Sequence, residues 1–381
     1  MSLMELRLED YRIENADDLL TPALIIYPEI VAANIRTALR MAGNDANRWR
    51  PHIKTVKAAE ILKQLMKHGV ANFKCATTLE LLTACNAGAA DVLVAFPVVG
   101  ATARRVLEIA RSHPSTRVSV LIESAAQFVP WRDSPIGVFV DVNPGMNRTG
   151  ISQERTGEIV ALARVAGRQF RGLHFYDGHM SAYSMNEREQ RAHEGYGRLL
   201  GIVDALTSAS VPIDEVITSG TPAAPWAISY PGFKSQSFVH RISPGTVIFN
   251  DTTSLDQLPD FGFAPAALVV TTVVSHPLPD HITCDAGHKS VSSDAGVPTC
   301  QVVGHPELIP LKPSEEHLPL QIDFEGRTPS IGEKLYLLPR HVCPTVNNFD
   351  EGLLVAGGRV RSAISITARG HEKPLGAALR S

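Results

Sequence analysis

Residues 71–96 read ANFKCATTLELLTACNAGAADVLVAF, and this stretch carries the pattern that decides the fold. Its two ends, 71–75 and 91–96, are short apolar runs of the kind that favours β-strands. The middle, 78–87, has helical periodicity and is followed by Gly88, a typical helix stop because glycine tolerates the left-handed conformation. The stretch therefore predicts a strand, a helix and a second strand in succession.

The same alternation extends from about residue 22 to residue 245. The runs predicted to be strands are 23–27, 49–54, 71–75, 91–96, 117–122, 136–142, 170–175 and 214–218. Eight strands separated by helices over roughly 220 residues match a (β/α)8 barrel in number and in size. A doubly wound open sheet shows the same alternation but usually has fewer strands, so we favour an α/β fold with a TIM-type barrel.

The rhythm changes after about residue 245. Residues 266–275, 281–285, 334–338 and 353–356 read as strands, with proline and glycine between them and little helical periodicity. We therefore expect a barrel at residues 21–246 and a C-terminal mostly-β domain at residues 247–381. The acidic N-terminal segment, residues 1–20, is expected to pack on the β domain or on the barrel.

The composition excludes several classes of protein. Of the 381 residues, 44% are hydrophobic and 20% charged, so the chain is long enough to bury a large core and disorder is not expected. The 36 Lys and Arg residues nearly balance the 39 Asp and Glu residues, which argues against nucleic-acid binding through bulk charge. Apolar stretches fall far short of the ~18 residues that span a bilayer, and we expect no secretory signal. Five cysteines without a Cys-x-x-Cys pair indicate a reducing cytoplasm.

Polar residues follow the predicted strands, at the positions where a barrel places its active site. His52 and Lys54 lie at the end of the run 49–54, where a buried lysine is unfavourable unless it is paired or reacted. One interpretation is a lysine with a lowered pKa that forms a Schiff base with an aldehyde cofactor. The other is a solvated lysine at a strand terminus.

Two short loops of small residues follow the last strand candidates. The first is SGT at 219–221, and the second is SPGT at 243–246, after a further short run at 238–242. Free backbone N–H groups in such loops cradle phosphates, and the loops after barrel strands 7 and 8 are a frequent phosphate site. Each loop alone is equally well explained as an ordinary glycine turn. Together with Lys54, the loops suggest pyridoxal phosphate.

A His-x-Cys pair, His341 and Cys343, lies in the predicted β domain. Residues i and i+2 of a strand point to the same side, so we expect the imidazole and the thiolate to converge. One nitrogen and one soft sulfur suit Zn²⁺. Two protein ligands are too few for a closed structural site, so the remaining positions would be open to water or substrate.

Six motifs occur in order: RPHIKT at 50–55, DVNPGMNRTG at 141–150, GLHFYDGH at 172–179, SGTP at 219–222, CDAG at 284–287 and HVCPTVN at 341–347. Together they resemble the D-threonine aldolase and D-serine dehydratase family of fold-type III pyridoxal phosphate enzymes, which is related to alanine racemase. The resemblance covers nearly the whole chain. It implies a barrel that holds the cofactor, a β domain that holds a metal, a small D-amino acid as substrate, and a homodimer with each active site near the subunit interface.

The resemblance also implies roles by position. Lys54 matches the Schiff-base lysine, and His52 and Tyr176 are further candidate catalytic residues. Arg148 would lie beside the pyridoxal ring and its phenolic oxygen, and Tyr176 would lie on the pyridine side. The residues expected to bind the cofactor are Lys54, Arg148, Tyr176, Ser219, Gly220, Thr221, Gly245 and Thr246.

The metal pair is the feature that bears on the reaction. His341 and Cys343 would hold the metal, for which Zn²⁺ suits a thiolate best and Mn²⁺ or Mg²⁺ are the alternatives. Dehydratases of the family resemble this chain in carrying His-x-Cys, whereas the aldolases usually carry His-x-Asp. We therefore expect a lyase that acts on D-3-hydroxy amino acids by D-serine dehydratase-type deamination to a 2-oxo acid and ammonia. The alternative is D-threonine aldolase-type cleavage to glycine and an aldehyde.

Two other interpretations and one departure from the family pattern remain. An amino-acid racemase would need a second acid/base on the opposite face of the cofactor, for which no convincing tyrosine is found. A non-catalytic pyridoxal phosphate carrier is usually a barrel alone, whereas roughly 135 residues follow the barrel here. Family members often have a second histidine where this chain has Val56, which leaves the substrate preference open.

Overall fold

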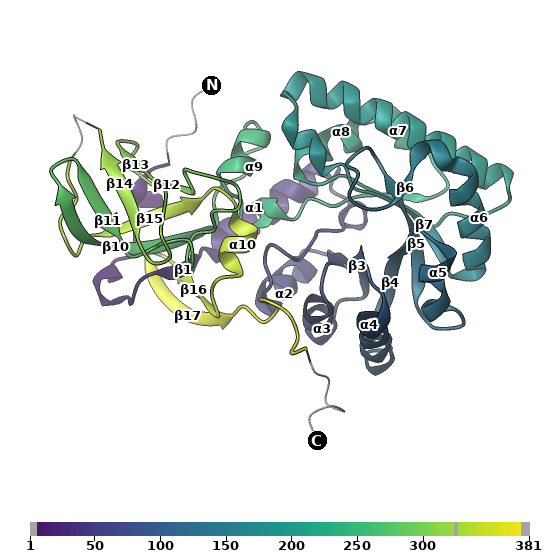
Figure 1. Ribbon diagram of the computed structural model, residues 1–381, viewed down its shortest axis with the longest axis horizontal. Helices are drawn as coiled ribbons and strands as arrows, with labels where there is room; N and C mark the ends of the chain where they lie inside the picture. Colours follow the sequence, from purple (N-terminus) through teal and green to yellow (C-terminus); the bar gives the residue numbers. More distant parts are fainter. Residues whose placement is uncertain (1–5, 324–326, 375–381) are drawn as a thin grey trace. The chain divides into compact units, whose positions relative to one another are not determined.

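The computed structural model describes residues 6–323 and 327–374, and the chain divides into two compact units (Figure 1). The barrel unit consists of Ala38–Lys54, Ala59–Gly245 and the described part of Gly370–Ser381. The β unit consists of Thr55–Ala58 and the described parts of Met1–Thr37 and Thr246–Arg369. Within the described ranges, no helix combines the length and the apolar character needed to cross a membrane.

Parallel strands form the centre of the barrel unit. In the described residues, the order across the sheet is β2 (Asn72–Cys75), β3 (Asp91–Pro97), β4 (Arg117–Ile122), β5 (Gly137–Asn143), β7 (Phe170–Phe175), β8 (Glu215–Thr218) and β9 (Val239–Ile242). The short β6 (Ile151–Ser152) lies beside β5. All neighbouring pairs in this order are parallel, as a (β/α) barrel requires.

Residues 49–52 close the barrel between β9 and β2. Trp49 pairs in parallel with Ile242 of β9, and His52 pairs in parallel with Lys74 of β2. Backbone hydrogen bonds run from the Lys74 N–H to the Pro51 carbonyl (2.9 Å) and from the Ile53 N–H to the Lys74 carbonyl (2.8 Å). The run predicted as a strand at 49–54 therefore occupies the position of a barrel strand, although it forms isolated bridges rather than a continuous strand.

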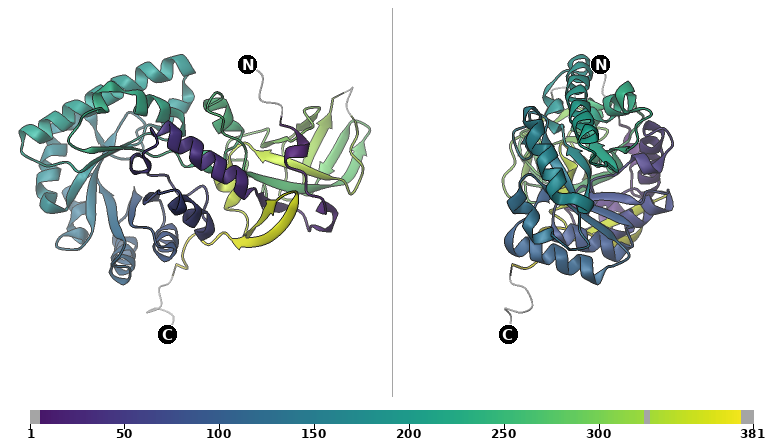
Figure 2. Two further views of the ribbon diagram at one scale, coloured as in Figure 1. Left: turned by 180° about the vertical axis from the view of Figure 1, so that it is seen from behind. Right: turned by 90° about the vertical axis from the view of Figure 1, so that its right-hand side faces the viewer.

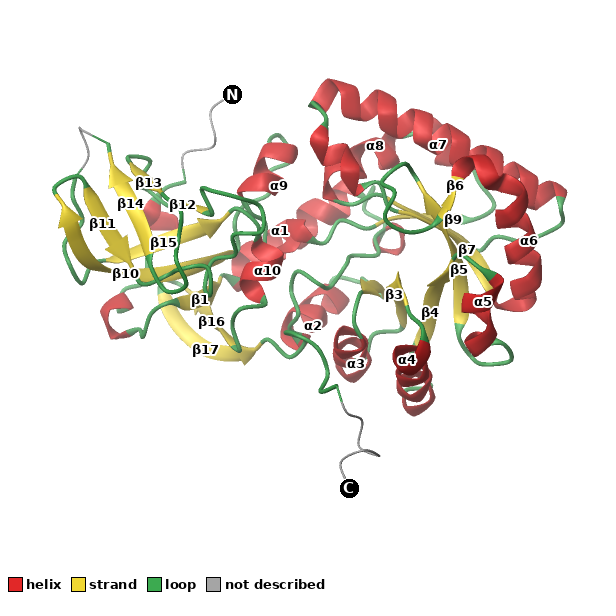
Figure 3. Cartoon of the chain, viewed as in Figure 1, coloured by secondary structure: helices red, strands yellow, loops and turns green. Residues whose placement is uncertain are grey.

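Helices cover the outside of the parallel strands (Figures 2 and 3). They are α2 (Ala59–Lys67), α3 (Thr78–Ala87), α4 (Gly100–Ser112), α5 (Ala125–Phe128), α6 (Thr156–Ala166), α7 (Met185–Ser208) and α8 (Ala224–Ser229). Helix α3 forms as its sequence predicts: Thr77 caps its start by accepting a hydrogen bond from the Glu80 N–H, and Gly88 ends it with φ +91°.

The β unit is built on a mixed sheet. In the described residues its order is β13 (Leu308–Pro310), β14 (Leu318–Ile322), β11 (His281–Cys284), β10 (Ala267–Leu278), β1 (Ala23–Ile26), β16 (Glu351–Ala356) and β17 (Arg359–Ser365). Beside this path, β15 (Lys334–Pro339) pairs with β10 and with β12 (Cys300–Val302). The helices in this part of the chain are α1 (Pro28–Met41), α9 (Thr252–Gln257) and α10 (Val342–Val346).

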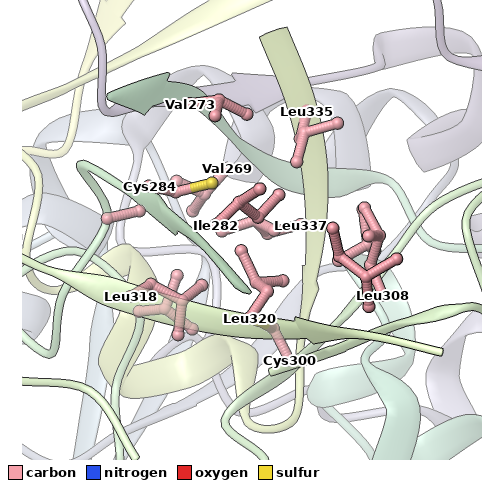
Figure 4. Close-up of a cluster of buried hydrophobic side chains, with 14 residues drawn as sticks. Val269, Val273, Ile282, Cys284, Cys300, Leu308, Leu318, Leu320, Leu335 and Leu337 are labelled. Carbon is pink, nitrogen blue, oxygen red and sulfur yellow. The ribbon is translucent and has the colours of Figure 1, made fainter. Parts of the chain in front are cut away.

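Two apolar clusters stabilise the β unit. One fills the space between β10, β11, β14 and β15, with Ile282, Leu320 and Leu337 fully buried (Figure 4). The other joins Tyr11 and Ile13 of the N-terminal segment to buried side chains of β1, β10 and β15. Burial of this kind contributes about 1.5–3 kcal/mol per large aliphatic side chain.

One predicted barrel strand belongs elsewhere. The run 23–27 was expected to open the barrel, but β1 pairs antiparallel with β10 and parallel with β16 in the β unit. The short run 238–242 instead supplies the barrel strand β9. Both runs are short and largely buried, so each predicts a strand without indicating which neighbour it pairs with.

A buried ion-pair network fixes the closing segment in the barrel. Arg50 is 0% exposed, and its guanidinium binds Glu215 in a bidentate pair (Nε–Oε1 2.8 Å, Nη2–Oε2 2.9 Å) and Asp91 through Nη1 (2.8 Å). Arg171 lies 3.2 Å from the other Asp91 oxygen. Burial opposes ionisation of Asp91, but the surrounding guanidinium groups hold the pKa of this carboxyl well below its usual value. Asp91 and Glu215 begin β3 and β8, so the network lies at the N-terminal ends of the strands.

Replacing Arg50 by methionine is expected to lower the free energy of unfolding by about 3–5 kcal/mol, because two buried carboxylates lose their shared cation. Urea unfolding followed by circular dichroism measures the change. Arg168→Met, at an exposed position, is the control and should change stability by less than about 0.5 kcal/mol. Equal stability of the two variants would show that the network does not hold the segment.

Candidate active site

Lys54 is positioned by the segment that closes the barrel. It follows the His52 bridge by two residues, and its backbone N–H donates to Nδ1 of His52 at 3.2 Å. Both side chains are half-buried. The structure therefore brings two of the predicted catalytic residues together at the C-terminal end of the closing segment, where barrels place their chemistry.

A chain of buried polar side chains lies in the barrel interior beside this position. Lys74 Nζ is 2.9 Å from Nε2 of His174, and Nδ1 of His174 is 2.7 Å from Oδ1 of Asp141. Lys74 is the third residue of the four-residue β2, whereas Asp141 and His174 face each other in the register of β5 and β7. Since β2 and β7 are not neighbours in the sheet order, the Lys74 and His174 side chains meet across the interior of the barrel.

Tyr176 lies just beyond the end of β7 and is contacted by two cations. Arg148 Cζ is 5.1 Å and Lys74 Nζ is 5.6 Å from the centroid of its ring. The ring also packs on two glycines: a Cβ at Gly178 would lie 2.5 Å from the Tyr176 hydroxyl oxygen, and a Cβ at Gly220 would lie 2.8 Å from its ring. These positions need glycine because the aromatic ring approaches their backbone closely.

Asp177 is a buried carboxyl next to Tyr176. Its Oδ2 accepts a hydrogen bond from the Tyr196 hydroxyl at 2.7 Å, and the Gly220 backbone also hydrogen-bonds to it. Burial raises the pKa of Asp177 to about 6, although these hydrogen bonds lower it. Its other oxygen, Oδ1, is buried without a hydrogen-bond partner.

The loops after β8 and β9 have the features of an anion site. The hydroxyls of Ser219 and Ser243 are buried without hydrogen-bond partners, and each follows the end of one of these two adjacent parallel strands. Ser219 adopts φ +57°, and Gly245 approaches the closing segment so closely that a Cβ would lie 2.3 Å from the His52 carbonyl oxygen. Unpartnered hydroxyls in a turn of small residues fit a bound phosphate, because a phosphate would satisfy them.

Thr221 and Thr246 were also predicted to bind the cofactor, and their surroundings differ from those of Ser219 and Ser243. Thr221 begins a 3-10 turn (Thr221–Ala223) directly after Gly220 and is buried. Thr246 begins the last stretch of the β unit, where its Oγ1 lies 3.8 Å from the Cys343 sulfur. In the β unit, the Thr55 hydroxyl also lies 3.1 Å from this sulfur, and the adjacent Val56 is fully buried.

His341 and Cys343 do converge, but not on a strand as expected. β15 ends at Pro339, and Cys343 lies in the first turn of α10, with His341 as the extended residue before the helix. The two side chains are hydrogen-bonded to each other because the chain turns into the helix between them. The prediction of a strand was wrong because Pro344 breaks strand pairing yet is tolerated in the first turn of a helix.

Acidic residues of the β unit support this pair. Oδ2 of Asp294 is 2.7 Å from His341 Nδ1, and the Val342 N–H donates to Oδ2 of the buried Asp251 at 2.9 Å. Burial opposes the charge on the His341 imidazole, but the Cys343 and Asp294 side chains raise its pKa to about 9. A carboxylate on Nδ1 fixes the ring and leaves Nε2 as the nitrogen for a metal, so a histidine and a thiol held in this way fit a divalent metal.

In the part of the chain that the structure describes, no third candidate metal ligand joins His341 and Cys343. Among residues 6–323 and 327–374, no three His, Cys, Asp or Glu side chains cluster as metal ligands. A metal bound by His341 and Cys343 would therefore keep positions for water or substrate.

Two site residues, Lys74 and Asp294, were missed from the sequence. Lys74 was hidden inside a strand, and Asp294 lies in a loop far from His341 in sequence. Asp177 was noted only as part of the motif at 172–179, without a role of its own. The signal for Lys74 was its charge between the apolar residues Phe73 and Cys75 of a strand, which is unfavourable unless the side chain is paired. No sequence pattern pointed to the pairing of Asp294 with His341.

Two family models match the chain. The model described as "Alanine racemase, N-terminal domain" matches residues 26–252, and the model described as "Putative serine dehydratase domain" matches residues 266–355.

Three similar proteins bear aldolase or dehydratase names. D-threonine aldolase of Arthrobacter sp. is 27% identical over 368 residues, covering 93% of each chain. The crystal structure of D-threonine aldolase from Filomicrobium marinum superposes with a TM-score of 0.84 at 26% identity, covering 93% of this chain and 97% of that chain.

The third protein, D-threo-3-hydroxyaspartate dehydratase of Delftia sp. (strain HT23), is 24% identical over 373 residues, covering 90% of this chain and 96% of that one. Structures of this dehydratase include one variant with a histidine replaced by alanine (TM-score 0.77). They also include one with the cysteine two positions further on replaced by alanine, in a metal-free form (TM-score 0.76).

Asp177 is expected to make stability depend on pH. Because its pKa is raised to about 6 in the folded chain, the contribution of Asp177 to stability is fully present below pH ~4, and about 2–3 kcal/mol of it is lost as the pH rises from ~4 to ~6. Asp177→Asn removes this titration, so the difference in unfolding free energy between wild type and variant should change by that amount between pH 4 and pH 7. Asp204→Asn, at an exposed position, should show a constant difference. A constant difference for Asp177→Asn would contradict the raised pKa.

Proposed function

The chain belongs to the alanine racemase N-terminal domain family and is a lyase, and from this premise we propose that it is a pyridoxal phosphate- and metal-dependent lyase of D-3-hydroxy amino acids. The cofactor proposal rests on the arrangement of side chains at the C-terminal end of the barrel. Lys54 lies there beside a buried polar interior, and the loops after β8 and β9 supply unpartnered hydroxyls for a phosphate. The names of the similar proteins support the choice of substrate class.

The barrel unit supplies the residues that would bind the cofactor in this proposal. Lys54 would hold the cofactor through its amine, and the same amine would move the proton at the substrate α-carbon. The Ser219 and Ser243 hydroxyls, with the backbone of the loops at 219–221 and 243–246, bind the phosphate. Arg148 and Tyr176, which contact each other, border the cofactor ring. His52 orients the Lys54 backbone through its ring nitrogen.

The β unit supplies the metal pair in this proposal. His341 and Cys343 hold the ion, Zn²⁺ by preference, and Asp294 fixes the imidazole. When bound, pyridoxal phosphate supplies an electron sink for the substrate α-carbon, and the metal supplies a Lewis acid for the substrate β-hydroxyl. The division into a barrel that holds the cofactor and a β unit that holds the metal remains part of the proposal, as does the homodimer. Within the expected barrel bounds 21–246, however, strand β1 and residues 55–58 belong to the β unit.

We infer that the reaction is dehydration, which gives a 2-oxo acid and ammonia. A thiol next to the histidine supports this choice, since a histidine and a cysteine with the same spacing were replaced in the structures of the dehydratase. Aldol cleavage is the second candidate, because the similar proteins also include D-threonine aldolases, one with the TM-score of 0.84. Both reactions use the same lysine and metal, so the product decides between them.

Incubation with D-threonine, pyridoxal phosphate and Zn²⁺ is expected to give equal amounts of 2-oxobutyrate and ammonia. Glycine with acetaldehyde would instead establish the aldolase. Chelation should abolish turnover and added Zn²⁺ should restore it, because the metal held by His341 and Cys343 would supply the Lewis acid for the β-hydroxyl.

The variant Cys343→Ala tests whether this thiol binds the metal that the reaction needs. We expect less bound metal and a fall in kcat of at least about 100-fold, while Cys85→Ala, a buried thiol of α3, keeps the metal content of the wild type. Full activity of Cys343→Ala with no bound metal would contradict the metal proposal, and inert D-threonine and D-serine would contradict the substrate class.

A further inference from the structure

Lys74 is a second buried lysine of the site, and none of the roles proposed above uses it. Lys74 is only 2% exposed. Burial of an ammonium is unfavourable unless the group is paired. The hydrogen-bond partner of its Nζ is the Nε2 of an imidazole, His174, rather than a carboxylate. A lysine buried in this way needs a reason beyond packing, because methionine would fill a similar volume without a charge.

The hydrogen bonds determine where the protons lie in the chain. An ammonium only donates, so Nε2 of His174 must accept from Lys74. A histidine that accepts at Nε2 carries its proton at Nδ1, and that nitrogen is 2.7 Å from Oδ1 of Asp141, which accepts it. The charged form of Lys74 therefore selects one neutral tautomer of His174.

Burial and the neighbouring charges together bring the pKa of Lys74 close to neutral pH. Burial lowers its pKa, Asp141 and Asp177 oppose this effect, and Lys54 and Arg50 reinforce it, so that the pKa of Lys74 is about 7. The pKa of His174 is also lowered, first by burial and then by Lys74, with Arg148 acting in the same direction and Asp141 against it.

We propose that Lys74 is a positioning residue of the reaction: its ammonium locks His174 in the neutral Nδ1–H form by keeping Nε2 unprotonated, and its deprotonation removes this lock on Nε2, while Asp141 continues to accept from Nδ1. The same ammonium contacts the ring of Tyr176, so the lock reaches a residue proposed to border the cofactor. This inference rests on the proposed function, because the state of His174 and Tyr176 matters to catalysis only if the cofactor binds at this end of the barrel.

The direct test is the tautomer of His174, measured by ¹⁵N and ¹³C NMR of histidine-labelled protein, with His174→Gln to assign the signals. In the wild type below pH 7, the Nδ1–H form should dominate. In Lys74→Met the opposing cation is gone and Asp141 remains, so we expect the pKa of His174 to rise and its titration to move to higher pH. Unchanged His174 signals in Lys74→Met would overturn the lock.

Steady-state kinetics supply a second readout. For the wild type, kcat should fall as the pH rises through about 7, because the lock is present only while Lys74 is protonated. Lys74→Arg keeps the charge at all pH values and should lose this limb, whereas Lys74→Met should lower kcat about tenfold across the range with KM little changed. An identical limb near pH 7 in all three proteins would assign it to another group and overturn the role of Lys74.

Two controls separate a positioning role from a structural one. Lys63→Met, at an exposed position of α2, should leave both the His174 signals and the pH profile of the wild type. Thermal unfolding of each variant shows whether the barrel is intact, and Lys74→Gln replaces Lys74→Met if the latter does not fold. The NMR result does not depend on turnover, so a failure of the lock and a failure of the proposed function are distinguished.

Discussion

The guanidinium of Arg50 binds two carboxylates, on Glu215 and Asp91, in a fully buried position at the N-terminal ends of the barrel strands. Because Arg50 is only four residues before Lys54, this anchor limits where the lysine can lie. The segment between them forms bridges rather than a full strand, so the ion pairs and the backbone bonds to Lys74 and Ile242 must hold it. The placement of the proposed active lysine therefore depends on charges at the opposite end of the barrel.

The barrel separates stabilising charges from reactive ones. At the strand starts, Asp91 and Glu215 share Arg50 and are paired with further guanidinium groups, of Arg171 and Arg241 respectively, and the pKa of Asp91 is held low. At the strand ends, Lys74 and Asp177 have pKa values moved towards neutrality instead, to about 7 and about 6. Groups poised near neutral pH are expensive to bury and are typical of functional sites, whereas fully paired ions are typical of structural ones.

Much of this arrangement could be predicted from the sequence, and the exceptions share one physical cause. Local runs predicted most barrel strands, and the spacing of His341 and Cys343 predicted their convergence. The partner of β1 could not be predicted, because an apolar run fits either sheet. The contact between Lys74 and His174 crosses the barrel between strands that are far apart in sequence, and periodicity reports only on neighbours along the chain.

The central claim is that the anchored segment presents Lys54, and not Lys74, to the cofactor. Borohydride reduction of the protein loaded with pyridoxal phosphate, followed by proteolysis and mass spectrometry, identifies the lysine that carries the pyridoxyl group. The account predicts a pyridoxyl group on Lys54 in the wild-type protein. In Lys54→Ala, it predicts no peptide with the added mass of a pyridoxyl group. A pyridoxyl group on Lys74 in the wild-type protein would contradict the account, because the lysine proposed to hold the proton of His174 would then hold the cofactor.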